Sequence, residues 1–256
     1  MEKRAVVVGG LGGIGSAIVK QLKSYPSCLN TVHEQSNICR FSWHVAATSR
    51  QLKQQESESL ADEIIPLELT SEESIAQASL HLQRSGKIDL CVVATGVLQT
   101  EQIRAEKCLN DLTEENLKHV LAVNAVGPAL VLKHFAPLLN YNQTPIMAFI
   151  SARVGSISDN QLGGWYSYRM SKAALNMLVR CANIELQRRH KHSVMVVGLH
   201  PGTVETPLSA PFARSIPKDK LFTADYAAAH LLNCLEHLTA EDGGNCFAYD
   251  GSLIEA

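Results

Sequence analysis

The stretch that decides the fold is Arg4-Ala-Val-Val-Val-Gly-Gly-Leu-Gly-Gly-Ile-Gly15. Its first half, up to Gly9, is apolar without polar alternation, which predicts a strand buried on both faces of a parallel sheet. The following run, 16–25, has the spacing of an amphipathic helix. Glycines between a strand and a helix let the backbone approach a ligand, and the free N–H groups at the helix start favour phosphate. We therefore expect a pyrophosphate at this turn.

The glycines of this turn fit two motifs. Gly10, Gly12 and Gly15 satisfy G-x-G-x-x-G, whereas Gly9, Gly13 and Gly15 satisfy G-x-x-x-G-x-G. Either spacing alone is a weak signal. The strand–turn–helix context favours a dinucleotide site over a merely tight turn.

The rest of the chain alternates between the two kinds of element. We expect further strands at 43–47, 65–69, 88–95, 146–151, 193–199 and 245–249, and helices from Thr70, at 113–139, from about Tyr168 and at 223–238. Such alternation predicts an α/β fold, a doubly wound parallel sheet of Rossmann type in three layers. A length of 256 residues suits one domain, 1–256. Within it, we expect a surface insertion at 26–41 and a substrate lid at 208–221.

Composition excludes several classes of function. A formal charge of −2 leaves no basic excess for nucleic acid. Seven dispersed cysteines without a Cys-x-x-Cys pair indicate reduced thiols, and neither a disulfide scaffold nor a metal site. The N-terminus lacks a signal-peptide core, so we expect a cytoplasmic protein. The most apolar segment, 120–132, is too short to span a membrane and contains Asn124 and Pro128.

A tyrosine and a lysine lie four residues apart in the segment Gly164-Trp-Tyr-Ser-Tyr-Arg-Met-Ser-Lys-Ala-Ala-Leu175. On a helix, Tyr168 and Lys172 share a face. A neighbouring ammonium favours the phenolate and lowers the tyrosine pKa toward the range of acid–base chemistry. One such pair also arises easily by chance, so the spacing alone does not establish a site.

The residues after the second and third strands bear on the choice of cofactor. An acid after the second strand pairs with a ribose 2′-OH, whereas an arginine pairs with a 2′-phosphate. Arg50 stands there and favours NADP(H), although it also fits an ordinary helix start and NAD(H) remains possible. Glu34 supplies the missing acid only if the insertion folds back. Glu68, at the end of the third strand, is placed to accept from an adenine amino group.

Three further residues are candidates for the reacting end. Ser151 emerges at a strand's carboxyl end, where ligands gather in open α/β sheets. Asn124 lies inside an apolar run, so its amide holds either an ordered water or a neighbouring loop. Thr206 follows a loop fixed by proline and glycine, and is placed to bond a cofactor phosphate or amide.

Together these residues resemble the short-chain dehydrogenase/reductase family over essentially the whole chain. The resemblance is carried by Gly9-x-x-x-Gly13-x-Gly15, Asn124, Ser151, Tyr168-x-x-x-Lys172 and Pro201-Gly202-x-Val204-x-Thr206. Ser151-Ala-Arg-Val-Gly-Ser-Ile-Ser and the Gly164 segment look most like the bacterial C-factor and sniffer-type carbonyl reductase branch. Family members commonly carry the catalytic serine about 13 residues before the tyrosine, as the second of a Ser-Ser pair. That place is Ala152 here, so we assign the role to Ser151, with Ser156 as the alternative.

The resemblance implies hydride transfer between a nicotinamide and a small carbonyl or alcohol. The long apolar helix at 113–139 and the Tyr168 helix are candidates for a two-fold contact, so we expect a homodimer or homotetramer. It implies Asn124, Ser151, Tyr168 and Lys172 as catalytic residues. The implied cofactor contacts are Gly9, Gly13, Ile14, Gly15, Arg50, Glu68, Leu69, Gly96, Tyr168, Lys172, Pro201, Gly202, Val204 and Thr206. Two alternatives remain, a cofactor-binding signalling protein with little turnover and a sugar epimerase or dehydratase, although only about 50 residues follow Thr206 for a substrate domain.

Overall fold

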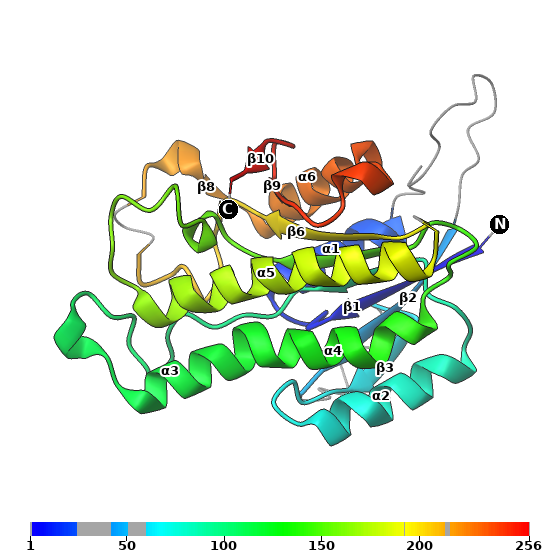
Figure 1. The fold of residues 1–256 in the computed structure, drawn as a ribbon, viewed down its shortest axis with the longest axis horizontal. Helices are drawn as coiled ribbons and strands as arrows, with labels where there is room; N and C mark the ends of the chain where they lie inside the picture. The colour runs from blue at the N-terminus through cyan, green and yellow to red at the C-terminus, as the bar shows by residue number, and fades with distance from the viewer. Residues whose placement is uncertain (1, 25–41, 51–59, 192, 213–215, 256) are drawn as a thin grey trace.

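A sheet of mostly parallel strands runs through the centre of the molecule (Figure 1). The computed structural model describes residues 2–24, 42–50, 60–191, 193–212 and 216–255. Its strand order is β10-β9-β6-β5-β4-β1-β2-β3, with only β10 antiparallel to its neighbour. The strands are β1 Glu2–Val8, β2 Ser42–Ser49, β3 Glu63–Pro66, β4 Leu90–Val93, β5 Ile146–Ile150, β6 Met195–His200, β9 Cys246–Ala248 and β10 Leu253–Ile254. The predicted insertion, 26–41, lies outside the described residues.

Helices cover both faces of this sheet. On one face lie α1 Gly13–Ser24 and α6 Ala224–His237, and on the other lie α2 Glu72–Arg84, α4 Gly127–Phe135 and α5 Tyr166–Arg189. Each face has its own buried core, one containing Ile18 and Leu231, the other Phe135 and Leu175. The order of alternating strands and helices confirms the predicted three-layer, doubly wound fold.

Several predicted boundaries differ from the structure. β3 begins and ends earlier than predicted, because the chain leaves the sheet at Pro66. α1 begins at Gly13, before the predicted start at Ser16. The sequence does not indicate this earlier start, because glycine has a poor helix propensity. Two short strands, β7 Thr203–Val204 and β8 Leu221–Phe222, pair in parallel and join the two ends of the predicted lid. Residues 213–215 of that lid lie outside the described part.

The predicted helix 113–139 is one continuous run from Glu114 to Leu138. It consists of α3 Glu114–Leu121, a π-helical segment Ala122–Val126, α4 and a final 3₁₀ turn. Within the single chain this run is not buried on every side, because Val126 is 53% exposed. By length and composition this run is able to cross a membrane, as are many core helices. Here Val131 and Phe135 pack fully buried against the sheet.

Candidate active site

The glycine turn after β1 is shaped by close backbone contacts. Gly9 has a φ of 79°, a left-handed conformation that favours glycine. Any side chain at Gly15 would collide with the carbonyl of Gly9, so the turn closes directly onto the start of α1. A Cβ on Gly13 would lie 2.8 Å from Thr206 Cγ2. The structure therefore brings the glycine turn and the 201–206 loop together, as a shared cofactor site requires.

The residues present fit a pyrophosphate. α1 begins at Gly13, so the backbone N–H groups of its first turn, including that of Ile14, lack intrahelical acceptors. Thr95 lies against Gly9, and its buried hydroxyl has no hydrogen-bond partner within the described chain. A helix N-terminus and an unpartnered hydroxyl at a narrow glycine turn are suitable donors for phosphate oxygens.

The corner expected to hold the adenosine is formed by the ends of β2 and β3. Arg50 is exposed directly after β2. The carboxylate of Glu68 accepts from the backbone N–H of Thr70 at 3.0 Å and from its hydroxyl at 2.8 Å. The N–H of Thr70 chiefly, with the nearby charge of Arg50, lowers the Glu68 pKa. Arg50 and Glu68 are thus close, although Glu68 already bonds Thr70 through one oxygen.

Tyr168 and Lys172 both lie on the buried face of α5, with 8% and 2% of their surfaces exposed. The Lys172 Nζ donates to the carbonyl of Ile150 at 2.8 Å and lies 5.7 Å from the centroid of the Tyr168 ring. A Cβ on Gly96 would lie 3.5 Å from this Nζ. The predicted pair therefore shares one face, at the ends of β4 and β5.

Burial controls the protonation of this pair. It raises the Tyr168 pKa to about 12 and lowers the Lys172 pKa to about 8. The expectation of a lowered tyrosine pKa is therefore not met, since burial disfavours the charged phenolate. Near neutral pH the phenol keeps its proton and can donate it to an alkoxide, which is a far stronger base.

Asn124 is fully buried in the π-helical segment. Its Oδ1 accepts from Val97 N at 2.8 Å, and its Nδ2 donates to Val97 O at 2.8 Å and to Ser171 Oγ at 3.0 Å. Asn124 therefore holds a neighbouring loop rather than an ordered water, because its amide oxygen and both amide hydrogens already have protein partners. Asn124 thus ties the chain after Gly96 to α5 between Tyr168 and Lys172.

The hydroxyl of Ser151 is bonded to residues other than Tyr168. It donates to Asn176 Oδ1 at 2.6 Å and also bonds Cys246. Asn176 is two turns beyond Tyr168, about 12 Å along the helix axis. Assigning the substrate carbonyl to Ser151 therefore needs correction, because alternation along β5 turns its side chain under α5. Ser156, the alternative, is buried among Ser158 and the backbone of Asp159.

Ala152, not Ser151, faces the tyrosine. It packs in one buried cluster with Leu98 and Tyr168, against which Trp165 and Phe212 are partly buried. Trp165 meets the Tyr168 ring edge-on at 6.3 Å and Phe212 at 5.0 Å between centroids. The wall beside the phenol is thus apolar and aromatic, which suits the apolar part of a carbonyl substrate.

The loop after β6 borders the site on its other side. Pro201 is buried, and Gly202 has a φ of 74° with Phe222 and Tyr249 packed against its α-carbon. Val204 is buried in the β7–β8 pair. The predicted residues Pro201, Gly202, Val204 and Thr206 therefore form one supported loop next to Gly13.

Sequence reasoning missed Glu106. Its carboxylate is only 2% exposed and accepts hydrogen bonds from Ser167, beside Tyr168. An acid in a polar loop carries no motif, so the sequence offers no signal of this contact.

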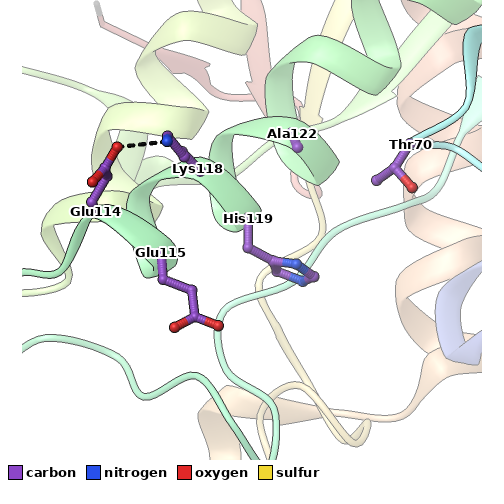
Figure 2. Close-up of a pocket in the computed structure, with 6 residues that line it drawn as sticks. All are labelled: Thr70, Glu114, Glu115, Lys118, His119 and Ala122. Carbon is purple, nitrogen blue, oxygen red and sulfur yellow. Dashed lines mark ion pairs between the residues drawn. The ribbon is translucent and has the colours of Figure 1, made fainter.

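A separate hollow of about 580 Å³ lies at the start of α3 (Figure 2). It is lined by Thr70, Glu114, Glu115, Lys118, His119 and Ala122. Figure 2 shows Glu114 and Lys118 paired with each other and Thr70 on the opposite side. None of the predicted catalytic residues lines this hollow.

Known proteins share this sequence pattern and this fold. Residues 3–216 match the family model described as short chain dehydrogenase. A 1-hydroxy-2-glutathionyl-2-methyl-3-butene dehydrogenase of Rhodococcus is 31% identical over 74% of the chain and 78% of its own length. The C-signal protein of Myxococcus xanthus is 33% identical over 57% of the chain and 82% of its own.

Solved structures agree with the sequence matches. The carbonyl reductase Sniffer of D. melanogaster superposes over the full length of both chains with a TM-score of 0.82 at 21% identity. An NADPH-bound carbonyl reductase from chicken fatty liver superposes with a TM-score of 0.80 at 24% identity, over 100% of this chain and 95% of its own. Carbonyl reductases thus share the fold, and C-signal is among the sequence relatives. With a family match over residues 3–216, the chain belongs to the short-chain dehydrogenase/reductase family of oxidoreductases.

Proposed function

We propose that the protein is an NADP(H)-dependent reductase of small carbonyl compounds. The observation that carries this proposal is the placement of a protonated tyrosine and a buried lysine beside the glycine turn. Tyr168 and Lys172 lie at the ends of β4 and β5, and the turn at 9–15 follows the adjacent β1. A dinucleotide lying along this edge would place its nicotinamide near the phenol.

Each group then has a distinct task. The bound nicotinamide supplies the hydride. Tyr168 donates its proton to the oxygen of the reduced carbonyl, which balances the hydride added at carbon. Lys172 holds the nicotinamide ribose, and its position at 5.7 Å from the ring favours proton release as negative charge develops on the phenol.

The remaining residues hold the cofactor and the site in place. Gly9, Gly13, Ile14, Gly15 and Thr206 would hold the phosphates, and Gly96 lies beside Lys172. Asn124 keeps the 96–97 chain against α5, so its contribution is the geometry of the lysine. The apolar wall at Ala152 and Trp165 receives the apolar part of the substrate.

The test is the NADPH-dependent reduction of a panel of aldehydes, ketones and quinones by Tyr168→Phe. We expect turnover to fall at least 100-fold, since general acid catalysis contributes about 10²–10⁴-fold. Tyr166→Phe is the matched control, because that phenol is on another face and has Met170 one turn later. Full activity of Tyr168→Phe would contradict the proposal.

The preference for NADP(H) rests on Arg50, which is exposed directly after β2 and whose charge acts on the nearby Glu68. In Arg50→Ala, we expect the KM for NADPH to rise while the KM for NADH stays constant. The NADPH-bound chicken reductase adds support for this cofactor. An unchanged ratio of the two KM values would assign the 2′-phosphate to other residues.

A second candidate is a cofactor-binding signalling role with little turnover, favoured by the likeness to C-signal and by the absence of a hydroxyl at Ala152. Binding of NADPH without turnover on the whole panel would support this role. We further propose a cytoplasmic homo-oligomer that acts on small molecules, with no nucleic-acid or membrane partner.

A further inference from the structure

A buried carboxylate is placed at the start of the helix that carries Tyr168 and Lys172. Glu106 belongs to the loop between β4 and α3 and is 2% exposed. Burying a carboxylate is costly unless hydrogen bonds compensate for lost water. Its position therefore requires specific donors, and α5 supplies them.

Three hydrogen bonds join Glu106 to this helix start. Glu106 Oε1 accepts from the hydroxyl of Ser167, and Oε2 accepts from the Ser167 backbone N–H at 3.3 Å. Its backbone carbonyl accepts from Trp165 N at 2.6 Å. Ser167 itself is 1% exposed, so the contact is shielded from water.

The start of α5 lacks a cap of its own. Trp165 stands at the capping position with a φ of 49° and makes no side-chain cap bond. The preceding Gly163 and Gly164 also have φ values of 63°, so three successive residues are left-handed. The Glu106 carboxylate, bonded to the free N–H of Ser167, does what a capping side chain does, and it also suits the positive end of the helix dipole.

Tyr168 lies directly between two anchored neighbours. Ser167 is held by Glu106, whereas the Arg169 guanidinium donates to the carbonyl of Gly164 at 3.0 Å and to that of Val154 at 3.4 Å. Leu98 and Ala105, which belong to the same loop as Glu106, pack in the buried cluster around Tyr168. A shift in the first turn of α5 would therefore move the phenol relative to the apolar wall.

We propose that Glu106 is a positioning residue for the proton donor. It fixes the first turn of α5 from a distant loop and so directs the Tyr168 hydroxyl at the substrate. This inference rests on the proposed reductase function, and its role is separate from cofactor binding, since no cofactor contact assigned above involves Glu106.

The experiment compares Glu106→Ala and Glu106→Gln with Glu101→Ala, which removes an exposed acid of the same loop. In Glu106→Ala we expect kcat to fall about tenfold or more while the KM for NADPH changes less than twofold. Glu106→Gln keeps an acceptor for Ser167, so it should recover part of kcat. The double variant Glu106→Ala with Ser167→Ala should lower kcat little more than either single change, because both changes remove the same hydrogen bond.

A second measurement is independent of turnover. Amide hydrogen exchange at residues 166–170 should accelerate at least tenfold in Glu106→Ala, with the C-terminal half of α5 unchanged. If the wild type reduces no carbonyl, the proposed function fails while exchange still decides the role of Glu106. Unchanged exchange at 166–170, or a kcat within twofold of wild type in an active enzyme, would overturn the inference.

Discussion

Ala152 places a methyl group beside Tyr168, the proposed proton donor, while the neighbouring hydroxyl of Ser151 bonds Asn176. Hydrogen bonds aimed at developing charge often give large rate effects. Because Ala152 offers no such hydrogen bond, we expect an added hydroxyl at this position to raise kcat.

Ala152→Ser tests this reading. The added hydroxyl would face the carbonyl oxygen, so we expect kcat for a good carbonyl substrate to rise about tenfold, equivalent to about 1.4 kcal/mol. Ser151→Ala, which removes the hydroxyl bonded to Asn176, serves as the comparison and should leave kcat within a few-fold of wild type. A loss of activity in Ala152→Ser, with a drop in Ser151→Ala, would return the role to Ser151.

His200, at the end of β6, gives the folded protein a pH dependence. Burial chiefly, with the charges of Arg153 and Lys172, lowers its pKa to about 4, against a weaker opposing effect of Asp250. Its Nδ1 is buried without a partner within the described residues. Between about pH 6.5 and pH 4, His200 is protonated in the unfolded chain but neutral in the folded chain. The free energy of unfolding therefore falls as the pH drops through this range.

This loss is measurable with His200→Gln. From the two pKa values of His200, we expect the free energy of unfolding of the wild type to fall by about 1–2 kcal/mol from pH 7 to pH 5. Urea unfolding at both pH values should show a smaller acid loss in His200→Gln than in wild type. An equal loss in the two proteins would mean that the histidine is protonated in the fold.

At the scale of elements, the sequence predicts the strands well where they are buried on both faces. Uninterrupted apolar runs predict β1 and β5, and both are found. The sequence does not reveal side-chain direction at the end of β5, because Ser151 and Ala152 differ only by alternation. The β7–β8 pair escapes prediction as well, since each strand has two residues and forms through contacts distant in sequence.

Packing between elements overrides local propensity at Gly127. A Cβ there would collide with the side chain of Leu69 and lie 2.8 Å from its carbonyl oxygen. Alanine favours a helix over glycine by about 1 kcal/mol. Overpacking usually costs about 1–3 kcal/mol, so we expect Gly127→Ala to be destabilising overall. Urea unfolding measures this, with Val126→Ala at the preceding exposed position as control, and a stabilised Gly127→Ala would show that α4 moves freely away from Leu69.

For the whole molecule, the fold and the cofactor edge follow from sequence because glycines, buried strands and the tyrosine–lysine spacing are local signals. The contact of Glu106 with Ser167 and the raised pKa of Tyr168 depend on tertiary burial, which no local pattern records. The same holds for subunit contacts. Yet α5 has an exposed apolar stripe, Met170, Met177 and Ile184, at 51%, 63% and 39% exposure.

This stripe is the basis for the proposed oligomer. A spacing of seven residues keeps the three side chains on one side of α5, and Val126, 53% exposed, lies on the adjoining helix. Exposed apolar patches of this kind mark interfaces, and two-fold pairing would bury the same stripe from both copies.

We expect light scattering to give twice the chain mass of 27.9 kDa for wild type. Met177→Glu should give a monomer, since pairing would bury two unpaired carboxylates, whereas Leu253→Glu, at a 56% exposed site on β10, should not. A monomeric wild type, or equal masses for both variants, would exclude this face as the subunit contact.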